Sequence, residues 1–197
     1  MASIPIVQVG TPVLRERAHE IAVEKIGTAQ FAELCAAMVE TMREAPGVGL
    51  AAPQIGLPLR IFVMEDQPEY VANLTPEETA ERDREAVPLR IFVNPSLTPI
   101  GEKKVGFFEG CLSVDGYVGY VERYAEVEVT GLDEKGQPHT MRAHGWAARI
   151  LQHEFDHLEG ALYIDRMLTR SFSTSELFKA HYGGKSIAEI RELLGAG

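Results

Sequence analysis

The stretch that decides the fold of this chain reads GWAARILQHEFDHL and covers residues 145–158. Residues four apart lie on nearly the same side of a helix, so His153 and His157 face one direction if this stretch is helical. Apolar residues occupy two sides of that helix: Trp146 and Ile150 beside the histidines, and Leu151, Phe155 and Leu158 roughly opposite. Such a helix is buried between layers, where unpartnered imidazoles are costly. We therefore predict a buried helix whose histidines meet a metal ion and a water-filled pocket.

His153, Glu154 and His157 form the HExxH pattern, in which two histidines bind a metal ion and the glutamate acts on a metal-bound water. A catalytic site typically takes three protein ligands and keeps one position for water. Glu159 falls on the wrong side of the helix, whereas Cys111 offers a thiolate, which binds iron or zinc strongly. The short pattern also fits a core helix whose histidines are satisfied by hydrogen bonds, so that reading stays open on this motif alone.

The rest of the chain mixes helices and strands. Thr28 is a predicted N-cap of an amphipathic helix that ends before Gly47, and Ser186 is a predicted N-cap of a last helix. Strands are expected over residues 59–64 and 90–94, and a hairpin over 125–130 and 138–143. This mixture predicts an α+β fold in a single domain over residues 1–197.

Three stretches carry weaker signals. Residues 47–56 are too rich in glycine and proline for a regular element but are mostly apolar, so we expect a packed loop. Thr75 begins a capping-box pattern, which predicts an exposed helix to about Ala86 that is a solvated elaboration rather than part of a site. The tail over residues 168–197 is divergent, and apart from the helix after Ser186 it matches no pattern.

Composition excludes several classes of protein. The formal net charge of -10 argues against a nucleic-acid binder, which would show a basic face. No window is apolar enough for a membrane span, and the first residues do not read as a signal or transit peptide. Two cysteines are too few for a disulfide framework, which favours a reducing compartment, and Cys35 is expected to be a small core residue.

Three segments, taken together and in order, resemble the signature motifs of the peptide deformylase family: residues 47–54 (GVGLAAPQ), 109–113 (EGCLS) and 152–157 (QHEFDH). The resemblance extends from about Val9 to Met167, and the helix with Trp146 and the insertion at Thr75 are similar to the organelle-type members. It implies a central metal-binding helix surrounded by antiparallel β-sheets. It also implies removal of the formyl group from the initiator methionine of nascent polypeptides.

The resemblance assigns roles residue by residue. It implies three metal ligands: Cys111, His153 and His157. It implies Glu154 as the general acid/base, and as oxyanion donors the Gln54 side chain and the Leu112 backbone N–H. It implies a peptide-binding groove lined by Val48, Gly49 and Gly110. The chemistry agrees, because a glutamate can carry the water's proton to the leaving amine and an uncharged amide suits an oxyanion beside a metal.

Further expectations concern neighbouring residues. Trp146 shares the His153 side of the helix, so we predict that it walls the methionine pocket, although plain core packing explains it nearly as well. Glu109, Asp156 and Arg123 are expected to form an ion-pair set that orients the site; the alternative is surface pairs of little worth. Many family members carry a basic residue where Val118 stands, which removes that contact to the substrate backbone here.

The expected cofactor is one divalent metal ion. The family works more often with Fe²⁺, and a purified sample can carry Zn²⁺, Ni²⁺ or Co²⁺. The expected partners are N-formylmethionyl peptides, with a transient ribosome contact and the choice of monomer or homodimer left open. The bacterial cytoplasm is the expected compartment, with a mitochondrion or plastid as the alternative. Two other functions stay open: a zinc endopeptidase built on HExxH, and an inactive deformylase-like binding module.

Overall fold

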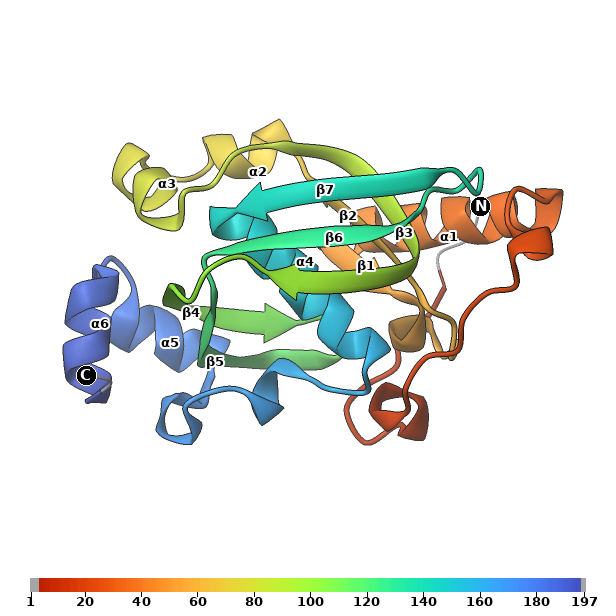
Figure 1. Ribbon diagram of the computed structural model, residues 1–197. Helices are drawn as coiled ribbons and strands as arrows, with labels where there is room; N and C mark the ends of the chain where they lie inside the picture. Colours follow the sequence, from red (N-terminus) through yellow and green to blue (C-terminus); the bar gives the residue numbers. More distant parts are fainter. Residues whose placement is uncertain (1–3, 196–197) are drawn as a thin grey trace.

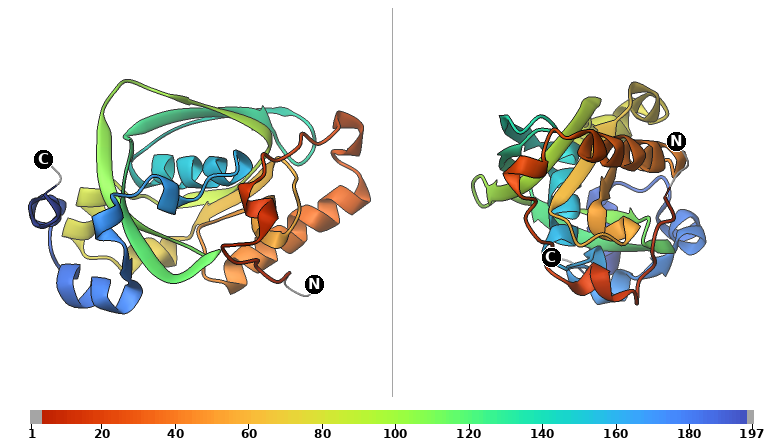
Figure 2. Two further views of the ribbon diagram at one scale, coloured as in Figure 1. Left: turned by 90° about the horizontal axis from the view of Figure 1, so that it is seen from below. Right: turned by 90° about the vertical axis from the view of Figure 1, so that its right-hand side faces the viewer.

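The computed structural model describes residues 4–195. Its central element is helix α4 (Gly145–Leu158), which lies between two antiparallel sheets (Figure 1). The view from below shows α4 enclosed by strands, with α1 and the C-terminal helices α5 and α6 toward opposite ends of the molecule (Figure 2). The α+β architecture and the central helix predicted above are confirmed.

The larger sheet has the strand order β1-β2-β3-β6-β7, and all its pairings are antiparallel. Its strands are β1 (Gly49–Ala51), β2 (Ile61–Asp66), β3 (Val87–Pro99), β6 (Glu126–Leu132) and β7 (Pro138–His144). Strand β2 is buried on both faces because Ile61 and Val63 pack toward α1 (Ala29–Glu44) while Phe62 and Met64 pack toward α4. This sheet therefore supplies one wall around α4.

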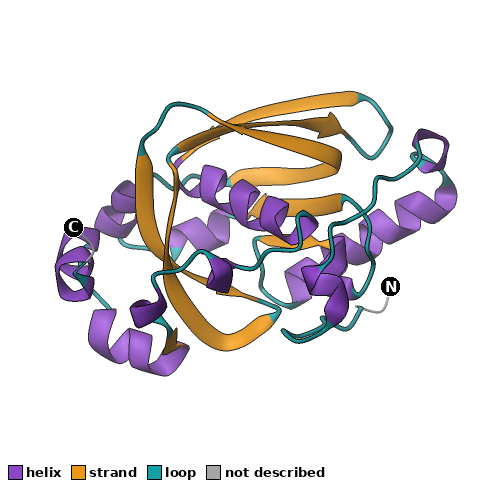
Figure 3. Cartoon of the chain, turned by 60° about the horizontal axis from the view of Figure 1, so that its bottom comes forward, coloured by secondary structure: helices purple, strands orange, loops and turns teal. Residues whose placement is uncertain are grey.

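The second sheet is a long hairpin of β4 (Lys104–Cys111) and β5 (Val114–Tyr124), extended at the β5 side by β8 (Ser173–Thr174). The hairpin curves around α4 from the side opposite β6 and β7 (Figure 3). Its pairing is regular from Lys104 to Gly110 and shifts before Cys111. The shift and the following turn place Cys111 at the tip of the hairpin, beside α4.

Helix α4 begins directly after β7 and ends before Gly160, whose φ of +72° lies in the left-handed region that favours glycine. Ala148, Leu151 and Leu158 are completely buried against the larger sheet. That packing fixes the rotation of the helix, so its remaining face points toward the β4–β5 hairpin. The helix predicted from the 145–158 stretch is confirmed.

The strand and helix predictions are confirmed in most places. Thr28 caps α1 by accepting a hydrogen bond from Phe31 N at 3.3 Å, and β6 pairs with β7 as predicted. The prediction that residues 47–56 form no regular element is wrong, because Gly49–Ala51 pairs with β2 as β1 and Ala52–Ile55 forms a 3-10 helix. A three-residue edge strand needs little intrinsic propensity, because burial against α1 and α4 stabilises it.

The insertion before β3 contains α2 (Pro68–Ala72) and α3 (Pro76–Arg82). The predicted capping box is confirmed, since Glu78 N donates to Thr75 Oγ1 at 3.1 Å and Thr75 N donates to Glu78 Oε2 at 3.0 Å. The helix ends earlier than predicted because Asp83 adopts a left-handed conformation with φ of 47°.

The C-terminal segment forms α5 (Ser175–Tyr182) and α6 (Ile187–Leu194). Ser186 caps α6 as predicted, accepting from Glu189 N at 3.3 Å, and α6 packs Ile190 and Leu194 on Tyr120 of β5. The remaining 3-10 helices are Pro12–Arg15, Val23–Lys25, Tyr163–Asp165 and Thr169–Ser171. Within residues 4–195, no helix has the length and apolar character needed to cross a membrane.

Candidate metal centre

Three potential metal ligands converge between the hairpin tip and α4. One ligand atom each from Cys111, His153 and His157 lies within 4.8 Å of the others. The Cys111 Sγ is 3.3 Å from His157 Nε2. The structure thus brings together the cysteine and the two histidines that the sequence analysis singled out. Cys111 precedes His153 by 42 residues and His157 by 46 residues along the chain.

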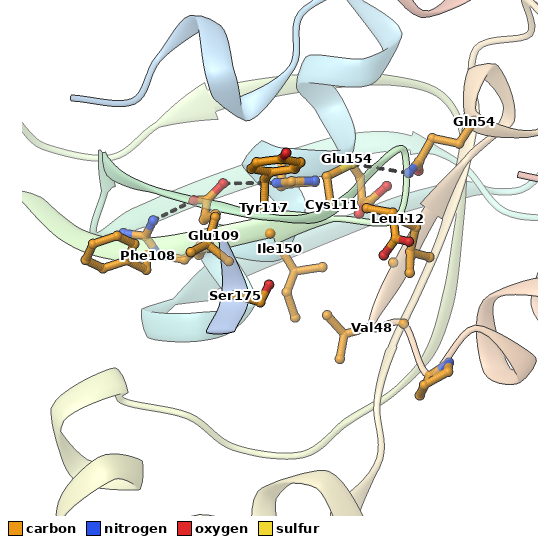
Figure 4. Close-up of a pocket in the computed structure, with 18 of the residues that line it drawn as sticks. Val48, Gln54, Phe108, Glu109, Cys111, Leu112, Tyr117, Ile150, Glu154 and Ser175 are labelled. Atoms are coloured by element: carbon orange, nitrogen blue, oxygen red, sulfur yellow. Dashed lines mark hydrogen bonds and ion pairs between the residues drawn. The ribbon is translucent and has the colours of Figure 1, made fainter. Parts of the chain in front are cut away.

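The surroundings of Cys111 suit a thiolate. Its Sγ accepts a hydrogen bond from Ser113 N at 3.5 Å and another from Gln54 Nε2 at 3.6 Å, the second of which is drawn in Figure 4. Donors of this kind stabilise a negative sulfur, which is the form that binds a metal. Two buried atoms beside it, His157 Nδ1 and Glu154 Oε2, have no hydrogen-bond partner among the described residues. A sulfur and two imidazoles are the donor set of zinc and iron sites, so these residues fit a divalent ion.

Glu109 on β4 connects the ligand set to a buried network of arginines. Its Oε2 accepts from His153 Nδ1 at 2.9 Å and from Arg123 Nη2 at 2.8 Å. Its Oε1 accepts from Arg123 Nε at 2.6 Å and from Arg149 Nη1 at 2.5 Å. Because Nδ1 of His153 donates to a carboxylate, its Nε2 carries the lone pair that a metal needs.

The charges in this network keep Glu109 ionised. Burial by itself would raise the pKa of the Glu109 carboxyl, but the charge of Arg123 and its hydrogen bonds outweigh burial and hold the pKa well below its ordinary value. Arg123 also donates to Asp156 Oδ2 at 2.7 Å. The predicted ion-pair set among Glu109, Asp156 and Arg123 is confirmed, and it is buried rather than on the surface.

Arg123→Met is expected to weaken both the fold and the metal site, because it leaves two buried carboxylates short of a partner. Breaking a buried ion pair from one side costs about 3–5 kcal/mol of stability. Losing a group that orients a metal ligand typically costs about 10–100-fold in metal affinity. Urea unfolding and Zn²⁺ titration of the metal-free protein would measure the two effects.

The control for that variant is Arg142→Met, which removes a surface pair with Glu126 whose side chains are 62% and 38% exposed. Surface pairs contribute about 0–1 kcal/mol, so this variant should keep its metal affinity and nearly all its stability. Equal effects of the two substitutions would contradict an orienting role for Arg123.

Glu154 is buried against the first strand of the larger sheet. Burial raises the pKa of its carboxyl to about 7, and a cation bound beside it would bring that pKa down again. A Cβ at position 49 would lie 2.3 Å from Glu154 Oε1, so only glycine fits there. Gly49 therefore allows the carboxylate to lie directly against the β1 backbone and beside the ligand set.

A pocket of about 390 Å³ opens at this cluster (Figure 4). The sequence-predicted residues that line it are Val48, Gly49, Gln54, Gly110, Cys111, Leu112, Trp146, His153 and Glu154. The structure adds lining residues that sequence reasoning missed: Phe108, Tyr117, Ile150 and Ser175. Ser175 begins α5 and Tyr117 lies opposite β8, so only the fold of the C-terminal segment could reveal them.

The end of the insertion contacts Trp146, which lines this pocket, but no described residue of the insertion lines the pocket itself, so its prediction as a solvated elaboration is not contradicted. The guanidinium carbon of Arg84 lies 5.3 Å from the centre of the Trp146 ring, and that of Arg82 lies 6.0 Å from it. Asp83 O accepts a hydrogen bond from Trp146 N at 3.3 Å. The sequence of α3 is mostly polar, which predicts an exposed helix. The contacts with Trp146 come from the residues at the end of α3 and just after it.

The model of the family described as polypeptide deformylase matches residues 3–172. The chain belongs to the peptide deformylase family. It is 52% identical over 171 residues to the chloroplastic peptide deformylase 1A of Solanum lycopersicum, covering 87% of this chain and 62% of that protein. It is 42% identical over 168 residues to the mitochondrial peptide deformylase of Homo sapiens, covering 85% of this chain and 69% of that protein. Both of these relatives are organellar proteins, which agrees with the similarity to organelle-type members noted in the sequence.

Solved peptide deformylases share the fold as well. A Met-ala-ser-bound crystal structure of the class I type b enzyme from Acinetobacter baumannii superimposes with a TM-score of 0.74 at 30% identity, covering 84% of this chain and 99% of that one. The chain spans 62% and 63% of the two plant deformylases. Helices α5 and α6 lie beyond the residues that the family model matches.

Proposed function

We propose that this chain is a metal-dependent peptide deformylase, which hydrolyses the formyl amide of N-formylmethionyl peptides to formate and a free amine. The observation that carries the proposal is the convergence of Cys111, His153 and His157 beside the buried Glu154, at the base of a pocket. Membership of the deformylase family supports it. We further propose that residues 1–197 act as one catalytic domain.

Cys111, His153 and His157 would hold the ion. A bound divalent ion supplies Lewis-acid chemistry: it acidifies a water molecule and polarises the formyl oxygen. Glu154 would accept a proton from the water molecule while the water oxygen forms a bond to the formyl carbon. The same carboxyl would then give the proton to the amide nitrogen as the C–N bond breaks, which leaves Glu154 ready for another turnover.

Gln54 and Leu112 are proposed to donate hydrogen bonds to the oxyanion. The Gln54 Oε1 accepts from Ala51 N at 2.8 Å, which fixes the orientation of the amide and directs its Nε2 toward the Cys111 sulfur. A donor held in place before the reaction costs no reorganisation when charge develops. Leu112 follows Cys111 at the hairpin tip and lines the same pocket.

The peptide is proposed to bind as an added strand between the two sheets. Strands β1 and β4 are both end strands, and Val48, Gly49 and Gly110 line the pocket between them. Backbone groups of an edge strand can pair with an extended peptide. The Met-ala-ser peptide bound to the Acinetobacter baumannii relative supports this substrate class. Val118 lines the pocket too, and its apolar side chain offers a substrate backbone no charged contact.

The identity of the metal ion and the cellular compartment are proposals as well. We propose Fe²⁺ as the native ion, with Zn²⁺, Ni²⁺ or Co²⁺ able to fill the same site, because a sulfur and two nitrogens suit all four. We propose the bacterial cytoplasm as the compartment, with a mitochondrion or plastid as the alternative that the named organellar relatives favour. Ribosome contact and the choice of monomer or homodimer stay predictions.

The deciding experiment is anaerobic purification with metal analysis, followed by incubation with formyl-Met-Ala-Ser. Stoichiometric release of formate and of Met-Ala-Ser is expected, and chelation should abolish both until Fe²⁺ or Co²⁺ is added back. Cleavage inside an unformylated peptide without formate release would favour the zinc endopeptidase. Peptide binding with no formate release, at full metal occupancy, would favour the inactive binding module.

A further inference from the structure

The two residues proposed to donate to the oxyanion belong to separate parts of the fold. Gln54 lies in the 3-10 helix Ala52–Ile55, which follows β1 of the larger sheet. Leu112 lies in the two-residue turn between β4 and β5 of the smaller sheet. Because β1 and β4 belong to different sheets, the hydrogen bonds of the sheets do not fix the separation of the two donors.

The N-terminal residues 7–9 join these two parts of the fold. Val7 N donates to Gln54 O at 2.9 Å, which ties the segment to the 3-10 helix. Val9 N donates to Ser113 O at 2.7 Å, which ties it to the turn between β4 and β5. One short segment therefore contacts the backbone on both sides of the candidate metal centre.

The chain is anchored on each side of this segment. Before it, Ile4 N donates to Thr41 Oγ1 of α1 at 3.0 Å. After it, Thr11 N donates to Gln8 O at 3.0 Å, and the side chain of Leu14 is completely buried. A segment that is held at both ends can restrain the loops that it contacts.

The side chain of Gln8 holds the turn between β4 and β5 through both ends of its amide. Its Nε2 donates to Leu112 O at 2.9 Å, and its Oε1 accepts from Asp115 N at 3.2 Å. An amide whose nitrogen and oxygen are both used in this way has one preferred orientation. Gln8 therefore restrains the turn at its first residue and at the second residue of β5.

The carbonyl that Gln8 holds belongs to the same residue as the proposed oxyanion donor. On one side of Leu112, Cys111 is paired with Val114 in the hairpin. On the other side, Leu112 O and Ser113 N form one planar peptide unit, and Ser113 N donates to Cys111 Sγ at 3.5 Å. With both flanking units held, the two soft dihedral angles of Leu112 have little freedom. The direction of its N–H is thereby set before charge develops.

We propose that Gln8 is a positioning residue for deformylation: it fixes the Leu112 peptide as an oxyanion donor, while the backbone of residues 7–9 sets the distance of that donor from Gln54. The proposal rests on the proposed deformylase function. Gln8 is not among the described residues that line the pocket, so its action is indirect. Because Gln8 is exposed, water can replace part of its hydrogen bonds, and its removal should weaken the donor without abolishing it.

Gln8→Met tests the proposal, because methionine has nearly the length of glutamine without its hydrogen bonds. At full metal occupancy it should lower kcat for formyl-Met-Ala-Ser by about fivefold to tenfold, a fraction of the roughly 10²–10³-fold lost with a whole oxyanion donor. KM and the affinity for the product Met-Ala-Ser should not change, because the lost interaction strengthens only in the transition state. A wild-type kcat, or a fall in product affinity equal to the fall in kcat, would overturn the proposal.

Gln8→Glu separates the two hydrogen bonds of the side chain. Its carboxylate can still accept from Asp115 N but cannot donate to Leu112 O. We expect kcat to fall as in Gln8→Met, while the Asp115 amide keeps its protection from hydrogen exchange. A wild-type kcat in Gln8→Glu would show that the bond to Leu112 positions nothing, which would contradict the proposal.

The matched control is Gln137→Met, the same change at an exposed glutamine just before β7. It should leave kcat and the hydrogen exchange of residues 112–115 unchanged. If the wild type releases no formate, the proposed function fails, and hydrogen exchange of the Zn²⁺-loaded protein still decides the positioning role. Faster exchange of the Ser113 amide in Gln8→Met and Gln8→Glu than in the wild type supports that role, and equal exchange overturns it.

Discussion

Glu154→Gln is expected to retain its metal and to lose deformylation by about 10²–10⁴-fold, the usual contribution of a positioned acid/base. Glutamine has the shape of glutamate, so it fits the buried space against Gly49. Its amide cannot accept the proton of the attacking water or return it to the leaving nitrogen. Metal analysis and formate release, measured on the same preparation, would separate loss of chemistry from loss of the site.

The control for Glu154→Gln is Glu128→Gln, the same change on an exposed position of β6. It should behave as the wild type in both measurements. Two outcomes would count against the assigned role: a Glu154→Gln variant with a normal rate, or one that has lost its metal as well as its rate.

Cys111→Ser is expected to lose the metal. A serine hydroxyl stays protonated at neutral pH, whereas the thiolate it replaces accepts hydrogen bonds from Ser113 N and Gln54 Nε2 and faces His157. The loss of affinity should exceed the 10–100-fold that is typical of residues which only orient a ligand. Metal content after gel filtration, and the absorption of the Co²⁺-loaded protein, would measure it.

Cys35→Ser is the matched control because it makes the same atomic change in the other cysteine. Cys35 lies buried on α1, where burial raises the pKa of its thiol to about 11, so it is a neutral core group rather than a ligand. That variant should keep its metal and its Co²⁺ spectrum. Full occupancy in Cys111→Ser, together with cleavage inside unformylated peptides, would favour the endopeptidase.

The parts of this structure that sequence could predict are those with a local pattern. The 3.6-residue periodicity of α1 and α4 and the alternation in β6 follow from which residues pack inward, so these elements were predictable. Residues 104–124 gave no comparable signal, because the hairpin mixes glycines and charged groups that are buried by contacts with distant segments such as α4 and α6. Arg149 was missed for the same reason: the carboxylate that makes its burial tolerable, Glu109, lies 40 residues away.

The arrangement of the candidate site shows a similar division. The spacing of His153 and His157 is a property of one helix, whereas the approach of Cys111 depends on where the hairpin turns. The contact between Arg84 and Trp146 depends on the left-handed residue Asp83, which ends α3, and on the hydrogen bonds of Arg84 to Asp66 of β2. Such contacts join segments that no short window of sequence contains.

The placement of two of the end strands, β1 and β4, has a consequence for behaviour at high concentration. Unpaired strand edges invite other chains to stack on them, a common start of aggregation. Here β1 offers only three residues, and of β4 the last four residues line the same pocket, so at this place the edge backbone groups of the two strands face a recess and not a flat outer border. The feature that is suited to pairing with one extended chain is therefore poorly suited to self-association through stacked sheets.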